Sequence, residues 1–438
     1  MAPPDRVFIP DTVRNQHIYV PGKTRHGKST LFHALAYQDI KNGQGVCVID
    51  PKGDLVSSLV HWIPESRKDD CVYIDPDNPV PIDILDYANA REKQTLVGEL
   101  KYVITKGVNV EHAPLMNSIL NDVIYTLLDA NENGLDPPAT FLDVHDFLAV
   151  DHRRAKILKH VASPRHKERW LTMPSPKECM PTLTRMNDYV NSDYLTKVFG
   201  CPKPTLNIAR AMDERKILLV NLGGIDEPTK IFATMLIAKI RQAAFRRNKV
   251  SQSARVPFHL YVDEFEFFQT QDFSQILSFA GGYGLHLTLA NQFITQLDPE
   301  IRDSIFGNVG SFIIFNVSPK DAQAYKHIAW TRNRLDMQEP VDLANMPKYR
   351  ALFKIGGKDP IVRDTPAPPT GPPRNSRADY IKKRTLARYS CKSEDVRDNP
   401  SSDTTSDKNA DDAPQKQKGR PPAPPLGTKQ GNNPGPRR

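Results

Sequence analysis

Short runs of apolar, often β-branched residues recur along the chain between polar stretches. Runs of this length are typical of strands that are buried on both faces of a sheet. Helical segments follow several of them, at residues 29–39 after the first run and at residues 229–246 after the fourth. Strands that alternate with helices predict an α/β fold with a mostly parallel sheet. The predicted strands are residues 17–20, 45–50, 71–74, 216–222, 258–263, 285–290 and 311–317.

The pattern changes between residues 91 and 207, where strand-like runs disappear. Amphipathic stretches replace them at residues 92–106, 113–129, 140–149 and 183–199, and in the second stretch Leu115, Ile119, Val123 and Leu127 recur every four residues. That spacing places them on one side of a helix. We therefore expect an all-helical domain, 91–207, inserted into an α/β domain formed by 1–90 and 208–360. The alternative is that these helices cover the sheet and share its core.

Residues 361–438 differ in composition from the rest of the chain. They hold 13 of the 38 prolines, and their 16 Lys and Arg exceed their nine Asp and Glu by seven charges, against an excess of one in the first 360 residues. Such sequence buries too little apolar surface to offset the entropy of ordering. It predicts a Pro-rich, basic, disordered tail that allows one short helix near residues 377–389. The basic charge of the whole chain is therefore no argument for nucleic-acid binding by the folded part.

Cysteine usage and hydropathy exclude several classes of protein. The five cysteines are widely spaced and never form a CxxC pair, so the sequence predicts neither a disulfide framework nor a zinc site, and a reducing compartment fits. Apolar stretches long enough for a membrane span and a signal-peptide pattern are both lacking. We therefore expect a cytoplasmic protein.

The strongest chemical motif is GKTRHGKS, which matches G-x-x-x-x-G-K-[ST] between a predicted strand and a predicted helix. Glycines let the backbone amides wrap around a triphosphate, and the helix presents its first amides to the anion. Lys28 is expected to hold the β- and γ-phosphates of ATP, and Ser29 to ligate Mg²⁺. The predicted nucleotide-binding residues are Gly22, Lys23, Thr24, Arg25, His26, Gly27, Lys28, Ser29 and Thr30.

An acidic pair completes this prediction. The apolar run FHLYV ends in Asp263 and Glu264, at the carboxyl end of a strand, where open α/β sheets bind their ligands. Asp263 is expected to support the Mg²⁺ shell, and Glu264 to polarise the attacking water. The pair favours hydrolysis over binding alone, so the sequence predicts an ATPase.

Two further strand ends carry polar side chains. The turn DPKGD, at residues 50–54, faces either the nucleotide or a neighbouring subunit, or is an ordinary solvated turn. Asn291 and Gln292 end another predicted strand, where an amide can sense the γ-phosphate through the water; the alternative is a plain polar strand end.

Two other features have simpler explanations. The basic stretch at residues 380–389 contacts a nucleic-acid backbone or is merely a solvated face. His259 and His286 lie on apolar strands, and we expect them to be packed in the core and to bind no metal.

The order of these motifs resembles that of the HerA/FtsK superfamily of P-loop DNA motors, and within it the TraG/TraD-type coupling proteins of conjugation and type IV secretion. The resemblance covers residues 17–317 and extends more loosely to residue 388. Its motifs, in order, are the phosphate loop, DPKG, the helical insertion, MDERKILLVNL, DEF and ANQFITQL.

This resemblance implies a RecA-like motor domain that assembles into a hexameric ring, hydrolyses ATP with Mg²⁺ and moves DNA. It also implies that the helical insertion meets DNA or relaxosome proteins. Residue by residue, Lys28 and Ser29 match the nucleotide-binding positions, Asp263 and Glu264 the hydrolytic positions, and Gln292 the polar sensor.

Two departures from the family pattern affect these expectations. Coupling proteins usually begin with transmembrane helices, whereas sixteen residues precede the first predicted strand here, so we expect a protein that reaches the inner membrane, if at all, through a partner. The family also often has an arginine before the sensor strand, where this chain has Gly281 and Gly282. Arg302 and Arg255 are the candidate substitutes for an arginine that reaches a neighbouring subunit.

Three functions remain open from the sequence. The first is a DNA-translocating coupling ATPase that delivers DNA to a transfer channel. The second is a HerA- or FtsK-like motor for DNA processing or packaging without a secretion partner. The third is a nucleotide-dependent cargo adaptor that does not translocate DNA.

Overall fold

The structure is a computed structural model that describes residues 7–105, 114–270, 273–332, 338–367 and 376–391. Its centre is a nine-stranded sheet in the order β11-β10-β7-β1-β6-β5-β2-β4-β3. Neighbouring strands from β7 to β3 run parallel, whereas β10 and β11 are antiparallel. The strands are β1 (Ile18–Pro21), β2 (Gly45–Asp50), β3 (Cys71–Ile74), β4 (Ile217–Asn221), β5 (Phe258–Val262), β6 (Leu285–Asn291), β7 (Ser311–Ile314), β10 (Arg350–Ile355) and β11 (Ile361–Asp364). The predicted α/β fold with a mostly parallel sheet is confirmed.

Both faces of this sheet are buried. In β2, Val46 and Val48 join one apolar core, while Cys47 and Ile49 join the other, as the two-residue period of a strand requires. The first core is completed by α2 (Lys28–Lys41), α3 (Asp54–Leu59) and α16 (Arg377–Tyr389). The second core takes in α12 (Glu227–Arg246), α13 (Phe273–Phe279) and α14 (Pro299–Asn308). The shorter elements outside these layers are α1 (Asp11–Arg14), α15 (Pro319–Ala324), β8 (Trp330–Arg332) and β9 (Gln338–Pro340).

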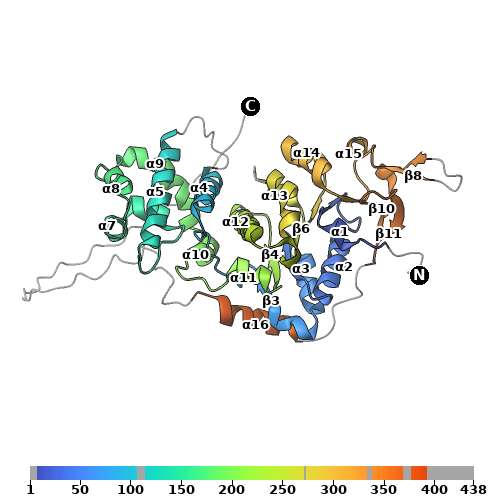
Figure 1. Ribbon diagram of the computed structural model, residues 1–438, viewed down its shortest axis with the longest axis horizontal. Helices are drawn as coiled ribbons and strands as arrows, with labels where there is room; N and C mark the ends of the chain where they lie inside the picture. Colours follow the sequence, from blue (N-terminus) through green and yellow to red (C-terminus); the bar gives the residue numbers. More distant parts are fainter. Residues whose placement is uncertain (1–6, 106–113, 271–272, 333–337, 368–375, 392–438) are drawn as a thin grey trace, which may run out of the picture. The chain divides into compact units, whose positions relative to one another are not determined.

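Helices fill the chain between β3 and β4, and Figure 1 shows α5, α7, α8 and α9 grouped together. The second apolar core runs on from the sheet into these helices. A separate inserted domain with boundaries at residues 91 and 207 therefore stays a proposal. The helices are α4 (Ala90–Thr105), α5 (Pro114–Glu132), α6 (Asp143–Ala149), α7 (Asp151–Lys159), α8 (Pro164–Arg169), α9 (Pro176–Val190), α10 (Asp193–Phe199) and α11 (Ile208–Asp213).

Two details of the predicted helices differ from the structure. The helix predicted over residues 183–199 is two helices, because Ser192 caps α10 by accepting a hydrogen bond from the backbone N–H of Leu195. Of the four residues spaced along α5, Leu115 is exposed, whereas Ile119, Val123 and Leu127 are buried. Residues 106 and 113, at the ends of two predicted helices, lie outside the described residues.

The ordered chain continues past residue 360, so the predicted start of the tail was placed too early. Strand β11 pairs with β10, and α16 forms over the residues that the sequence suggested. Helix α16 packs against the edge strand β3, where the Thr385 hydroxyl accepts a hydrogen bond from the backbone N–H of Tyr73 at 3.1 Å. The expected disorder of residues 392–438 falls outside the described residues.

A disulfide joins Cys201 to Cys391, just beyond α16. The expectation that the cysteines form no disulfide was wrong for this pair, because residues 190 positions apart meet only in the folded chain. The thiols of Cys47, Cys71 and Cys179 are free and buried. None of the described helices has both the length and the apolar character that a bilayer span needs.

Candidate nucleotide-binding site

The phosphate-loop motif forms a tight connection between β1 and α2. Gly27 caps the helix with a φ of 118°, a conformation that favours glycine. A Cβ atom on Gly22 would lie 2.6 Å from the Cβ of Phe315, so the loop also needs a residue without a side chain there. Two strand ends anchor the loop: Gly22 N–H donates to the Asn291 carbonyl at 3.2 Å, and Lys23 N–H to the Asn316 carbonyl at 2.6 Å. The two motif glycines are thus explained by close packing against β7 and by the turn into α2.

Lys28 is the first residue of α2, and its side chain folds back over the loop. Its Nζ donates hydrogen bonds to the carbonyl oxygens of Gly22 and Lys23, the latter at 3.2 Å. Burial lowers the pKa of Lys28, and the charges of Asp263 and Glu264 oppose that shift. Among the described residues, no carboxylate lies within ion-pair distance of this ammonium. The loop therefore encloses a positive charge that is not neutralised by direct contact.

The remaining loop residues lie at the mouth of the site. Thr24, Arg25 and Ser29 are exposed, whereas His26 and Thr30 are half-buried. The His26 ring hydrogen-bonds the Thr24 carbonyl at 2.9 Å, which holds the turn of the loop. The predicted nucleotide-binding residues thus form one continuous loop with several side chains open to solvent.

Asp263 follows β5 directly and is buried beside the loop. Its carboxylate accepts hydrogen bonds from the Ser29 hydroxyl and from the Glu264 backbone N–H, both at 3.0 Å. Burial raises the pKa of Asp263, while the nearby Lys28 ammonium counteracts that effect. A serine hydroxyl beside a carboxylate is the kind of oxygen donor set that Mg²⁺ prefers. The residues predicted as Mg²⁺ ligands are therefore in contact with one another.

Glu264 adopts a left-handed backbone conformation, with φ at 46°, immediately after the buried strand. Its carboxylate forms an ion pair with Lys52 and accepts a hydrogen bond from Gln292 Nε2 at 3.2 Å. Non-glycine residues in this conformation are uncommon and are often found at functional sites. The carboxylate is thereby held at the edge of the sheet that carries the phosphate loop.

The two amides at the end of β6 have different environments. The Gln292 side chain accepts a hydrogen bond from the Thr24 hydroxyl at 3.3 Å, so it links Glu264 to the loop. Asn291 is buried; it accepts from the Tyr19 hydroxyl at 2.6 Å and donates to the Phe293 carbonyl at 3.0 Å. Of this pair, Gln292 faces the candidate site and Asn291 supports the strand end. Because β6 lies between β1 and β5, Gln292 stands between the phosphate loop and the acidic pair.

The DPKG turn also faces the site, through Lys52 and its ion pair with Glu264. Asp50 shapes the turn by accepting hydrogen bonds from the backbone N–H groups of Lys52 and Val56, each at 3.1 Å. Burial raises the pKa of Asp50 to about 6. The turn thus contacts the acidic pair through Lys52, which an ordinary solvated turn would not do, and its contact with a nucleotide stays a proposal. We call Lys28, Ser29, Asp263, Glu264 and Gln292 the nucleotide-edge cluster.

Two residues at this edge were missed in the sequence. The charge of Glu266 interacts with those of Glu264 and Asp263, its buried Oε2 atom has no hydrogen-bond partner among the described residues, and burial raises its pKa to about 7. Tyr349 precedes β10, and its backbone N–H donates to the His26 carbonyl at 3.0 Å. The sequence did contain a signal for Glu266, because it is the third carboxylate in the motif DEFEF at residues 263–267. For Tyr349 there was none, because it lies more than 300 residues from the loop.

The glycines that replace the family arginine have a packing explanation. A Cβ atom on Gly281 would lie 1.9 Å from the Asn15 carbonyl oxygen, so no side chain fits there. Arg255 donates to the carbonyls of Arg247, Val250 and Gly282, which ties it to the loops before β5 and β6. Arg302 lies on α14, with Nε 3.5 Å from Asp303 Oδ1. An arginine in the nucleotide site is not established by these contacts.

The basic stretch on α16 uses several of its charges within the chain. Arg384 pairs with Asp69 at 3.0 Å, and Lys382 lies 3.9 Å from Asp75. The Tyr380 hydroxyl donates to Asp69 at 2.7 Å. These contacts favour a structural role for the stretch, which attaches α16 to the residues on either side of β3.

A second buried cluster lies near the amino ends of β1, β5 and β6. Arg14 binds both carboxylate oxygens of Asp39, one at 2.7 Å, and the Tyr261 hydroxyl also donates to Asp39. The rings of His259 and His286 pack edge to face at 5.0 Å between centroids. His259 is buried in the core, as the sequence predicted, whereas His286 is half-buried. We call Arg14, Asp39, Tyr261, His259 and His286 the amino-end cluster.

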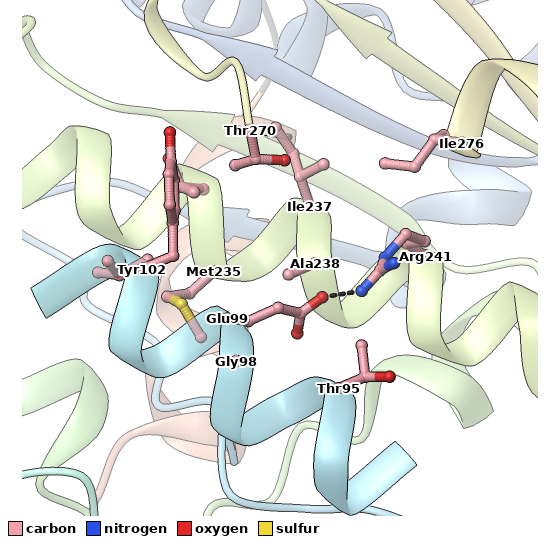
Figure 2. A pocket seen from close by; sticks show the side chains of 12 residues that line it. Thr95, Gly98, Glu99, Tyr102, Met235, Ile237, Ala238, Arg241, Thr270 and Ile276 are labelled. Atoms are coloured by element: carbon pink, nitrogen blue, oxygen red, sulfur yellow. Dashed lines mark ion pairs between the residues drawn. The ribbon is translucent and has the colours of Figure 1, made fainter. Parts of the chain in front are cut away.

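A cavity of about 330 Å³ lies elsewhere, between α4, α12 and α13 (Figure 2). An ion pair between Glu99 and Arg241 crosses it. Its lining contains no residue of the phosphate loop, of the acidic pair or of the sensor strand. The charged side chains of the lining, Glu99 and Arg241, already neutralise each other, so this cavity is not the nucleotide site.

Residues 257–330 match the family model described as the TraM recognition site of TraD and TraG. The resemblance to TraG/TraD-type coupling proteins is confirmed. The matched segment runs from the residue before β5 to β8, so it includes the acidic pair and the sensor strand. No curated protein matches the chain in sequence.

Solved structures of a coupling protein share the fold. The bacterial conjugative coupling protein TrwBΔN70 in its unbound form superposes with a TM-score of 0.61 at 12% identity, over 86% of this chain and 91% of that one. TrwB in complex with ADP and Mg²⁺ gives a TM-score of 0.60 at 15% identity, over 86% and 92%. TrwB with the ATP analogue ADPNP gives 0.60 at 14% identity, with the same coverage. At these identities the likeness concerns the fold, and the RecA-like fold expected for a coupling protein is confirmed.

Proposed function

We propose that this protein is an ATP-hydrolysing motor that moves DNA, of the TraG/TraD coupling type. The observation that carries the proposal is the meeting of five residues from three separate sequence motifs at one edge of the sheet: Lys28, Ser29, Asp263, Glu264 and Gln292. The match of residues 257–330 to the TraD and TraG model and the fold of TrwB support the setting in conjugation.

In the proposed reaction, the loop amides and the Lys28 ammonium bind the phosphates of ATP. Within the described part of the chain the buried ammonium pairs with no carboxylate, and it stabilises the negative charge that develops on the transferred phosphoryl group. Glu264 accepts a proton from the attacking water, and Gln292, hydrogen-bonded to Glu264, orients that water near the γ-phosphate. Lys52 pairs with Glu264 Oε1, and hydrolysis by a Lys52 variant tests whether that ion pair restrains the base.

Mg²⁺ fits the residues present, because the Ser29 hydroxyl and the Asp263 carboxylate offer oxygen ligands 3.0 Å apart. When bound, the ion neutralises phosphate charge. Solved TrwB complexes with an ATP analogue, and with ADP and Mg²⁺, support this choice of substrate and metal. ADP and phosphate are the expected products.

DNA dependence, ring assembly and contacts with relaxosome or secretion components complete the proposal. The helical segment α4–α11 is the proposed meeting point with DNA or protein cargo, and a homo-oligomeric ring, expected to be hexameric, is the proposed working form. Attachment at the inner membrane is proposed to depend on a partner. A motor for DNA processing and a cargo adaptor without translocation remain the competing functions.

The decisive experiment is steady-state ATP hydrolysis by the full chain, with and without single- and double-stranded DNA. The wild type is expected to hydrolyse ATP faster with DNA, and Lys28→Ala and Glu264→Gln are expected to abolish that activity while neither variant melts below the wild type. A control variant, Lys203→Ala, removes an exposed lysine that pairs with Asp136 at 2.8 Å, away from the loop. Activity in Lys28→Ala equal to that of the wild type would refute the site.

DNA stimulation separates a motor from an adaptor. Displacement of a hybridised strand or of a triplex-forming strand, dependent on ATP and lost in Glu264→Gln, is expected of the motor. ATP hydrolysis that is indifferent to DNA, without displacement, would favour the adaptor.

A further inference from the structure

The phosphate loop has one aromatic neighbour that the proposed reaction leaves unused. Tyr349 donates its backbone N–H to the His26 carbonyl at 3.0 Å. Its ring lies so close to Gly27 that a Cβ atom on that glycine would be 3.1 Å from Tyr349 Cδ1. Tyr349 is therefore in contact with the loop through both its backbone and its side chain.

The backbone of Tyr349 is held in an unfavourable conformation. Its φ is 59°, which is a rare value for an aromatic residue. Its carbonyl accepts hydrogen bonds from Thr365, from the backbone N–H at 2.6 Å and from the hydroxyl at 3.0 Å. Such conformations persist where the surrounding structure fixes them, and they cluster at ligand sites. Here the loop holds the amide of Tyr349, and the residue after β11 holds its carbonyl.

The strand order places Tyr349 on the opposite side of the loop from the acidic pair. Strand β10, which follows Tyr349, lies next to β7 and then β1, whereas β6 and β5 lie on the other side of β1. Because β10 is antiparallel to β7, its first residue reaches the same sheet edge as the phosphate loop. The carboxylates and Gln292 mark the γ-phosphate end of a bound nucleotide. The base, at the other end of the molecule, then points toward the Tyr349 side.

The side chain is also accessible. Tyr349 is 38% exposed, although its ring rests on the loop. Aromatic side chains bind nucleobases by stacking, which contributes about 1–3 kcal/mol per base and tolerates different bases because every base has a π-face. A ring fixed beside a phosphate site is suited to that task.

We propose that Tyr349 is the stacking platform for the base of the bound nucleotide, a role that rests on the proposed nucleotide-binding function. The substrate class of the site is therefore nucleoside triphosphates, and adenine and guanine nucleotides stack on Tyr349 with similar affinity. Inorganic tripolyphosphate, which lacks a base, binds to the loop without help from Tyr349.

The test measures binding of ATP, GTP and tripolyphosphate to the full chain in Mg²⁺ by calorimetry. Tyr349→Asn removes the ring, and asparagine tolerates the left-handed backbone, so the loop is preserved. This variant is expected to bind ATP and GTP about 5- to 150-fold more weakly, as the loss of one stacking contact predicts, and to bind tripolyphosphate as the wild type does. Tyr349→Phe keeps the ring and is expected to behave like the wild type.

Two controls separate the possible failures. Tyr380→Ala removes another exposed tyrosine, on α16, and is expected to change none of the three affinities. Lys28→Ala is expected to lose all three ligands. An equal loss of ATP and tripolyphosphate in Tyr349→Asn, or no loss of either, would overturn the stacking role while leaving the nucleotide site intact. A wild type that binds no ligand would overturn the proposed function itself.

Discussion

Two charged clusters lie at opposite ends of the same strands and differ in how their charges are matched. In the amino-end cluster, Arg14 and the Tyr261 hydroxyl together bind Asp39, so a cation and an anion neutralise each other inside the core. In the nucleotide-edge cluster, the partners of Lys28 among the residues that the structure describes are all backbone carbonyls. Buried charge alone therefore does not mark a functional site. What indicates a functional site is a buried charge whose counter-charge has to be supplied by a ligand.

The largest expected effect is the loss of activity in Lys28→Ala. Removing a charge that stabilises a transition state costs about 10²–10³-fold in rate, and loss of phosphate binding adds to that. Stability is expected to stay equal or to rise, because the variant no longer buries an unmatched ammonium. Hydrolysis and thermal melting measured on the same sample test both statements. A melting temperature well below that of the wild type would show that Lys28 supports the fold.

The opposite pattern is expected for Asp39→Ala in the amino-end cluster. Removing one partner of a buried ion pair leaves Arg14 unmatched and costs about 3–5 kcal/mol in the free energy of unfolding. Urea unfolding measures that loss, and the catalytic rate per folded molecule is expected to be unchanged. Asp151→Ala is the matched control, because this carboxylate is 92% exposed and its pair with Arg154 contributes less than about 1 kcal/mol. A lower hydrolysis rate per folded molecule in Asp39→Ala would show that the amino-end cluster also serves catalysis, which would contradict this comparison.

The pH dependence of stability sharpens the comparison further. Burial lowers the pKa of His17 and His259 to about 4 and that of His286 to about 3. Between pH 6.5 and these values the unfolded chain binds protons that the folded chain does not, so stability falls as the pH falls. Each such histidine contributes a slope of up to about 1.4 kcal/mol per pH unit.

Urea unfolding at pH 7 and at pH 5 tests this slope. His286→Gln is expected to reduce the loss of stability between the two values, whatever its effect at pH 7. The control is His152→Gln, which replaces an exposed histidine on α7 and is expected to keep the wild-type slope. A slope that is the same in all three proteins would show that His286 does not govern acid sensitivity.

The smallest expected effect on stability belongs to Lys52→Gln. The Lys52 side chain is 50% exposed, so its ion pair with Glu264 is screened by water and contributes less than about 1 kcal/mol. Chemical unfolding is expected to show this small change, and hydrolysis measured alongside reports whether the pair restrains Glu264. A destabilisation similar to that of Asp39→Ala would mean that both clusters serve the fold.

The sequence was most informative where one contiguous motif or one apolar run carries the signal. The phosphate loop, the acidic pair and the strands from β1 to β7 depend on neighbouring residues, and the structure has these strands at or within a few residues of their predicted ends. Strands β10 and β11 escaped notice because they are short antiparallel additions at the sheet edge, and β11 exposes most of its residues.

What could not be predicted depends on contacts across long stretches of chain. Lys52 pairs with Glu264, which lies 212 residues away in the sequence, and no local pattern predicts that pairing. Tyr349 reaches the loop because β10 joins β7 in antiparallel register, and its positive φ has no signature in the residue type. The break after α9 depends on the Ser192 cap, whose side-chain hydrogen bond competes with continuation of the helix. In each case the tertiary arrangement selects among conformations that the local sequence permits.

The docking of α16 on β3 also bears on how the molecule avoids polymerising. An edge strand offers unpaired N–H and C=O groups to any other extended chain, and this is a common route to aggregation. At β3, the Thr385 hydroxyl accepts a hydrogen bond from the Tyr73 backbone N–H, and Ala378 and Ile381 cover the neighbouring apolar surface. A chain that ends before residue 377 is therefore expected to self-associate through β3, whereas a chain that ends after residue 391 keeps the helix that covers this strand. Light scattering at matched protein concentration distinguishes the two.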